Sequence, residues 1–120
     1  MPFASKYVLI ANMDIDPAKE ALFNEIYDTE HVPHFLTVPG VNAAARLKSI
    51  PLAMRRPDGV QTADTSGVLA YSAVYEIDHP DVLLTQEWAD MVDEGRWTDE
   101  GRPYTRNRTY EFRKVIWPVG

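Results

Sequence analysis

Two histidines, two carboxylates and a tyrosine fall within the eight residues from Tyr27 to His34. Histidine is the side chain whose unperturbed pKa lies near neutrality, so a cluster of histidines and carboxylates can move protons. The whole chain has three histidines, and this segment holds two of them. A solvated helix end, capped and charged by polar residues, explains the same cluster, and the residue types alone leave both interpretations open.

His31 is the candidate residue for proton transfer. As a base, it needs a ring nitrogen that faces a pocket and a neighbour that fixes its tautomer, for which Glu30, Asp28 and Tyr27 are the local candidates. With a pKa near the reference value of about 6.5, activity that depends on His31 would rise with pH through that region. The alternative is an exposed histidine that interacts with the helix dipole.

His34 and Glu30 raise the question of a metal site. The spacing His-x-x-His and the pair Glu30 and His34, four residues apart, are compatible with metal ligands on one helical face. Pro33 intervenes and no third ligand is evident, so we expect no metal and a partly buried, structural His34. Glu30 would have a raised pKa if it lies on the apolar stripe of the helix, and would reach solvent if the helix turns before it.

Aromatic side chains are numerous enough to line a pocket for a flat, apolar molecule, although core packing explains them equally well. Arg46, Arg106 and Arg108 are suited to hold a carboxylate or a phenolate, or to form surface ion pairs. The aromatic set is Tyr71, Tyr75, Trp88, Trp97, Tyr104 and Tyr110. The residues that we expect to contact a substrate are Tyr27, His34, Arg46, Tyr71, Trp88 and Trp97.

The composition bounds the class of protein. A chain of 120 residues with 45% hydrophobic and 25% charged residues is typical of one globular, soluble domain. The net charge of −6 argues against a nucleic-acid partner. The absence of cysteine excludes disulfides, thiolate metal sites and cysteine nucleophiles. No signal-peptide pattern or membrane-length apolar run is present, so we expect a cytoplasmic protein without a membrane partner.

Motifs for nucleotide cofactors and for a serine nucleophile are missing. The sequence has no glycine-rich phosphate loop and no Gly-x-Ser-x-Gly. We therefore expect a protein that works without a cofactor.

Hydrophobic periodicity predicts the order β-α-β-β-α-β. Asp16-Pro17 supplies an N-cap and a proline at the first helical position, and Pro33 is expected to stop or bend the first helix near residues 28–31. A short helical piece follows at 33–38. The expected strands are 7–13, 41–50, 68–77 and 104–117, and the second helix begins at 79–81, carries Leu84, Trp88, Met91 and Val92 on one stripe, and ends at Gly95.

Two segments predict more than secondary structure. Residues 51–67 hold two prolines and Asp58-Gly59 with little periodicity, which predicts a long loop that is mobile or covers the mouth of a pocket. The strand Val68–Ile77 is apolar on both faces, so both faces of the sheet should be covered. A second copy of the chain is the simplest cover for the face without helices.

This order of elements is that of the ferredoxin-like fold, an α+β fold with a four-stranded antiparallel sheet and two helices on one face. The sequence further resembles the EthD-like dimeric α/β-barrel family. The resemblance rests on Asp-Pro, a helix ending in Tyr27-Asp28-Thr29-Glu30-His31-Val32-Pro33, the pattern Leu-x-x-Pro-Gly-Val at 36–41 and a strand that bears Arg46. The stretch 69–77 and the following Glu87-Trp88 are similar as well, whereas the loop 51–67 is long for the group.

The resemblance implies a homodimeric α/β barrel in which the histidine of the Glu-His-x-Pro motif, here His31, faces a pocket between sheet and helices. Proteins of this barrel superfamily include cofactor-free monooxygenases, polyketide cyclases and dehydratases, lactone isomerases and haem enzymes, so the fold does not settle the activity.

We expect a lyase or isomerase without a cofactor, which dehydrates, cyclises or isomerises an aromatic, polyketide-like or lactone substrate. His31 would move the proton, Glu30 or Asp28 would orient it, and Tyr75 or Arg46 would stabilise an enolate oxygen. A cofactor-less monooxygenase is the first alternative, and a non-catalytic ligand-binding or stress-response protein is the second.

Overall fold

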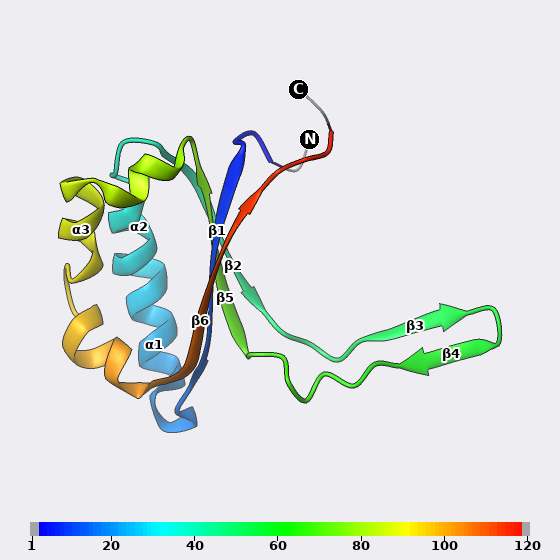
Figure 1. Ribbon diagram of the computed structural model, residues 1–120. Helices are drawn as coiled ribbons and strands as arrows, with labels where there is room; N and C mark the ends of the chain where they lie inside the picture. The colour runs from blue at the N-terminus through cyan, green and yellow to red at the C-terminus, as the bar shows by residue number, and fades with distance from the viewer. Residues whose placement is uncertain (1–2, 119–120) are drawn as a thin grey trace.

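A four-stranded antiparallel sheet with all its helices on one face forms the body of the protein (Figure 1). The computed structural model describes residues 3–118. The strands follow the order β2-β5-β1-β6, which is the order of the expected ferredoxin-like fold. Their bounds are β1 (Tyr7–Ile15), β2 (Val41–Lys48), β5 (Tyr71–Ile77) and β6 (Thr105–Lys114).

The first helical region changes type where the sequence predicted a stop or a bend, but it remains helical. The Asp16 side chain accepts a hydrogen bond from the Ala18 amide at 3.0 Å, which confirms the expected N-cap. The helix widens into a π turn just before Pro33, which has no amide hydrogen to donate, and continues as an α-helix through that proline. The successive segments are η1 (Pro17–Lys19), α1 (Glu20–Ile26), the π turn η2 (Tyr27–His31) and α2 (Val32–Phe35).

The second helical region is more broken than expected. It begins with the 3₁₀ turn η3 (Pro80–Leu84), and Thr85 then caps α3 (Gln86–Val92) by accepting a hydrogen bond from the Trp88 amide at 3.2 Å. Because the helix changes type at Thr85, Leu84 falls off the apolar stripe and is 82% exposed, so its assignment to that stripe is wrong. The π turn η4 (Trp97–Gly101) and the 3₁₀ turn η5 (Arg102–Tyr104) lead into β6.

The core lies between this helical layer and one face of the sheet. On β5, the side chains of Tyr71, Ala73, Tyr75 and Ile77 are buried beneath the helices, whereas the alternate residues are half-buried. The alternate residues are Ser72, Val74 and Glu76, so the strand is not apolar on both faces as the range 68–77 suggested. The strand itself begins only at Tyr71.

A bulge between β1 and β6 decides which arginines reach the helical face of the sheet. The register shifts between Asn12 and Asp14, and Asn107 on β6 takes a φ of 58°, which asparagine tolerates better than most residues. Asn107 also donates a hydrogen bond to Asp14 at 3.0 Å. The alternation of a regular strand is thereby interrupted between Arg106 and Arg108, within the strand expected at 104–117.

Residues 51–67 contain a β-hairpin and not an irregular loop. Strand β3 (Ala53–Arg56) pairs with β4 (Gly59–Thr62) across a turn in which Gly59 takes a φ of 126°, a value that glycine accepts at little cost. We call this hairpin the arm. It projects to the side of the sheet opposite the helices, so the expectation that this segment covers a pocket mouth is wrong (Figure 1).

Within residues 3–118, no helix combines the length and the apolar character needed to cross a membrane.

Candidate active site

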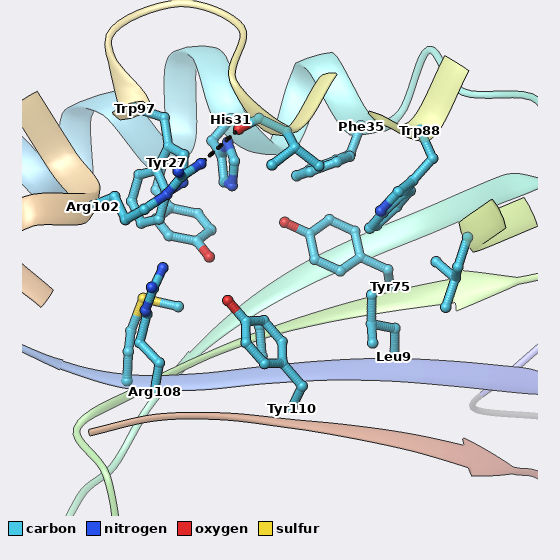
Figure 2. Close-up of a pocket in the computed structure, with 14 residues that line it drawn as sticks. Leu9, Tyr27, His31, Phe35, Tyr75, Trp88, Trp97, Arg102, Arg108 and Tyr110 are labelled. Atoms are coloured by element: carbon cyan, nitrogen blue, oxygen red, sulfur yellow. Dashed lines mark hydrogen bonds between the residues drawn. The ribbon is translucent and has the colours of Figure 1, made fainter. Parts of the chain in front are cut away.

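A cavity of about 460 Å³ lies between the helices and the sheet (Figure 2). Its walls are mainly apolar and aromatic, and polar groups reach it from the first helical region, from β5 and from β6. Such a largely apolar cavity with a few polar groups is typical of small-molecule sites. It is lined by Leu9, Ala11, Met13, Tyr27, His31, Phe35, Tyr75, Leu83, Trp88, Val92, Trp97, Arg102, Arg108 and Tyr110.

The π turn aligns three cavity residues of the first helical region. Tyr27, His31 and Phe35 are spaced by four residues, and all three line the cavity. In a regular α-helix such residues drift around the axis by about 40° per step, because 3.6 residues make one turn. The wider turn at Tyr27–His31 offsets that drift and keeps the three rings on one face.

His31 is packed among aromatic rings. Its ring stacks on Trp97 with centroids 4.4 Å apart and meets Phe35 and Tyr27 edge-on at 4.7 Å and 5.0 Å. The residue is 5% exposed, and its Nδ1 atom has no hydrogen-bond partner within the described part of the chain. Because His31 lines the cavity, a molecule bound there would contact this ring.

Burial changes the protonation of His31. Removal from water, and secondarily the positive charge of Arg102 and the proximity of His34, lowers the pKa of His31 to about 3. The imidazole is therefore neutral through the physiological range, and it is a weak base as long as no anion lies beside it. The expected titration near 6.5 is wrong, because that value assumed a solvated ring.

Three tyrosines supply hydroxyl groups to the same space. In Figure 2 the hydroxyls of Tyr27, Tyr75 and Tyr110 point toward the centre of the cavity. The Tyr75 hydroxyl is buried without a hydrogen-bond partner in residues 3–118. Burial raises the pKa of Tyr27 and of Tyr75, so both remain protonated and act as hydrogen-bond donors.

Two arginines give the cavity a positive charge. Arg102 donates hydrogen bonds to Asp93 at 2.7 Å and to the Val92 carbonyl at 3.3 Å. Arg108 extends from β6 toward the Tyr27 hydroxyl (Figure 2). No aspartate or glutamate is among the described residues that line the cavity.

Glu30 and Asp28 lie outside the cavity. Glu30 accepts hydrogen bonds from the amide and the guanidinium of Arg96, and these bonds hold the pKa of its carboxyl below the usual range. The pKa of Glu30 is therefore not raised, as a position on the apolar stripe of the helix would have required. Glu30 also does not line the cavity, so it is not in the catalytic position that we expected. Asp28 is exposed and pairs with Arg46 at 2.8 Å, so neither carboxylate orients His31.

Three expected substrate contacts lie behind the cavity wall. The Arg46 guanidinium sits over the Tyr27 ring at 4.6 Å, so Arg46 supports Tyr27 and does not itself line the cavity. Tyr71 is buried beside Phe23 and hydrogen-bonds Glu20. His34 is half-buried on the helix side that faces away, next to Gly95.

The remaining expected residues line the cavity, together with several residues that the sequence did not indicate. The cavity brings together His31, Tyr27, Tyr75, Trp88 and Trp97, as the sequence predicted. Sequence reasoning missed the floor of Leu9, Ala11 and Met13, although their alternation along one strand was a usable signal. It did not single out Leu83 or Arg102 as site residues, and it assigned Val92 only to the apolar stripe of the second helix. Arg108 was a candidate to hold a carboxylate or a phenolate and Tyr110 belonged to the aromatic set, and both line the cavity.

The described residues contain no group of three or more histidine, aspartate or glutamate side chains that could hold a metal ion.

The fold is shared with solved structures, although no protein-family model and no curated protein matches the sequence. An EthD-family protein from Bacillus halodurans aligns with 92% of this chain and 99% of its own, at 16% identity and a TM-score of 0.59. The fold that this chain shares with that protein is the dimeric α/β-barrel fold. The EthD-like resemblance is thereby confirmed at the level of the fold.

Two further barrel structures are similar over comparable lengths. A proposed antibiotic biosynthesis monooxygenase from Bordetella bronchiseptica covers 93% of this chain and 98% of its own, at 16% identity and a TM-score of 0.63. The haem degrader MhuD from Mycobacterium tuberculosis, with two haems in its active site, covers 95% and 99%, at 15% identity and a TM-score of 0.59. At these identities the similarity establishes the barrel fold alone.

Proposed function

We propose that the protein is a cofactor-free monooxygenase that acts on an aromatic, oxygenated molecule bound in the cavity. The observation that carries the proposal is a neutral, buried His31 beside tyrosine hydroxyls and cationic side chains in an otherwise apolar space. These groups suit removal of a proton from a substrate whose anion then reacts with oxygen.

The proton transfer comes first. His31 accepts a proton from an activated methylene carbon that lies next to an aromatic ketone. The developing negative charge on the ketone oxygen is stabilised by a hydrogen bond from the Tyr75 hydroxyl. That same charge offsets the low pKa of His31, because an anion beside the ring favours its protonated form.

The oxidation that follows needs no reductant other than the substrate itself. The carbanion adds to oxygen, and the resulting peroxide anion takes the proton from His31, which gives a substrate hydroperoxide. Loss of the second methylene proton and cleavage of the O–O bond yield a new carbonyl group and water. In total, a methylene group and one oxygen molecule become a carbonyl group and one water, and all four electrons come from the methylene carbon.

The similar structures favour oxygen chemistry over the lyase or isomerase activity expected from the sequence. One of them is a proposed monooxygenase and another degrades haem. Dehydration, cyclisation and isomerisation share the first proton transfer with the proposed reaction. Oxygen consumption therefore separates the two classes.

An oxygen electrode tests the proposal with anthrone, which carries such a methylene group. The purified protein without added cofactor should consume one oxygen per anthraquinone formed and release no hydrogen peroxide. Consumption of anthrone without oxygen uptake, or no acceleration at all, would contradict the proposal. Added haem should give no shifted Soret band, and a shift that disappears in His31→Ala would indicate a haem site instead.

A further inference from the structure

The cavity has a charge opposite to that of the chain. The chain carries a net charge of −6, whereas the charged residues that line the cavity are Arg102 and Arg108 and no carboxylate. Because burial and Arg102 keep His31 neutral and Asp93 pairs with Arg102, the uncompensated positive charge of the lining is that of Arg108. A cleft of one sign with low-dielectric walls concentrates ligands of the opposite sign.

Arg108 differs from the arginines that have structural partners. Arg46 pairs with Asp28, Arg96 with Glu30, Arg102 with Asp93, and Arg113 with Glu111. Arg108 makes no ion pair and no side-chain hydrogen bond to any residue in the range 3–118. Its guanidinium therefore keeps all of its donors available to a ligand.

The Arg108 side chain also points to a defined place in the cavity. The side chain points from β6 into the space onto which the Tyr27 and Tyr110 hydroxyls converge (Figure 2). A guanidinium binds a carboxylate through two parallel hydrogen bonds, and a neighbouring hydroxyl can donate a third. Arg108 and Tyr110 are both exposed, so an anionic group held here stays hydrated while an aromatic body fills the deeper cavity.

We infer that the substrate of this cavity is an aromatic carboxylate, and that Arg108 binds its carboxylate group at the β6 edge. The inference rests on the proposed use of the cavity as the substrate site, and it adds the chemical class of the ligand. A single unpaired guanidinium with tyrosine hydroxyls matches a singly charged carboxylate. The aromatic body then lies against the packed rings of Trp88, Phe35 and Tyr75, in the cavity that His31 also lines.

Calorimetric titration with cinnamate and with cinnamamide tests this inference, because the two probes share shape and differ in charge. The wild-type protein should bind cinnamate at least ten times more tightly than cinnamamide. In Arg108→Met, which keeps the aliphatic stem, the two affinities should agree within a factor of two. Arg106→Met is the matched control on the same strand, and it should preserve the wild-type ratio because Arg106 does not line the cavity.

Three results would overturn the inference: equal affinity of the wild type for the two probes, no binding of cinnamate at 5 mM, or an unchanged ratio in Arg108→Met. The readout does not involve oxygen, so it separates this inference from the proposed function. A cinnamate preference that depends on Arg108 would stand even if anthrone is not oxidised. Oxidation of anthrone by a protein without that preference would support the proposed function and contradict the inference that the substrate carries a carboxylate.

Discussion

The aromatic rings around His31 determine its protonation state. Stacking on Trp97 and edge contacts with Phe35 and Tyr27 exclude water, and the loss of hydration keeps the imidazole neutral. The same burial makes it a weak base until an anion lies beside it. Proton transfer is thereby coupled to the charge that develops on the substrate.

Protonation of His31 should make stability depend on pH. Its pKa falls from about 6.5 in the unfolded chain to about 3 in the folded one, so the unfolded state binds an extra proton between these values. The contribution of the neutral ring is complete above pH 6.5 and is lost as the pH falls toward 3. Urea unfolding at pH 7 and pH 4.5 should show a larger loss of unfolding free energy in the wild type than in His31→Gln.

His79→Gln is the control for that comparison, because His79 is an exposed histidine on another element. It should lose as much stability on acidification as the wild type. If His31→Gln shows the same pH dependence as the wild type, the ring is not held neutral by burial.

The sequence predicted single residues unevenly. His31 and Tyr27 were identified because their types and spacing are local properties of one helix. The position of Glu30 was predicted wrongly because its partner, Arg96, lies 66 residues further along the chain, and no local sequence pattern indicates that contact. The low pKa of His31 likewise depends on Trp97 and Arg102, which only the folded chain brings near.

At the scale of elements, two π turns shape the cavity wall. The first aligns Tyr27 with His31, and the second carries Trp97 against the His31 ring. Gly101 ends the second turn directly over Trp97. The site therefore depends on the small size of this glycine.

Gly101→Ala should disturb the Trp97 ring and with it the cavity. An added Cβ would lie 2.6 Å from Cε3 of Trp97, closer than real Cβ contacts, so the ring must shift. We expect a destabilisation of about 1–3 kcal/mol, typical of overpacking, measured by urea unfolding. Gly67→Ala is the matched control, because its Cβ would meet no atom within 4 Å. Equal stability of the two variants would contradict a tight fit at Gly101.

The arm should be dispensable for the cavity. Replacing residues 53–62 by a short glycine linker should leave probe affinity within a factor of two and the melting temperature of the monomeric body nearly unchanged, because the arm projects away from the helices (Figure 1). Calorimetry and thermal unfolding provide the two measurements. A large loss of affinity would show that the arm reaches the cavity.

Element boundaries were predictable where turn chemistry is local. Asp16-Pro17 and Gly95 acted as expected, and Asp58-Gly59 was a hairpin signal inside a segment that we interpreted as a loop. Pro33 correctly marked an irregularity, because the regular α-helix gives way to a π turn at 27–31 and a short α-helical piece follows at 32–35, although the backbone stays helical throughout. Widening a turn to accommodate a proline leaves no trace in hydrophobic periodicity.

At the scale of the whole molecule, the fold leaves one face of the sheet without helices. Leu47, which pairs with Ser72 on that face, is 55% exposed. We propose that the 120 residues form one domain that assembles as a homodimer through this face. Such burial of apolar side chains stabilises an interface by about 25 cal/mol per Å².

Light scattering at micromolar concentration tests the homodimer. The mass should be near twice 13.6 kDa. Leu47→Lys should shift the protein toward the monomer, because a buried lysine without a partner opposes association. A monomeric wild type would contradict the proposed assembly and would leave the cavity of the single chain as described.

The turnover of His31→Ala tests the central claim most directly, namely that His31 accepts the substrate proton. With anthrone in the oxygen electrode, we expect a loss of about a hundredfold or more, the usual contribution of a positioned base, and partial recovery on addition of free imidazole. His34→Ala, outside the cavity, should lose stability more than turnover. Full turnover in His31→Ala would contradict the account.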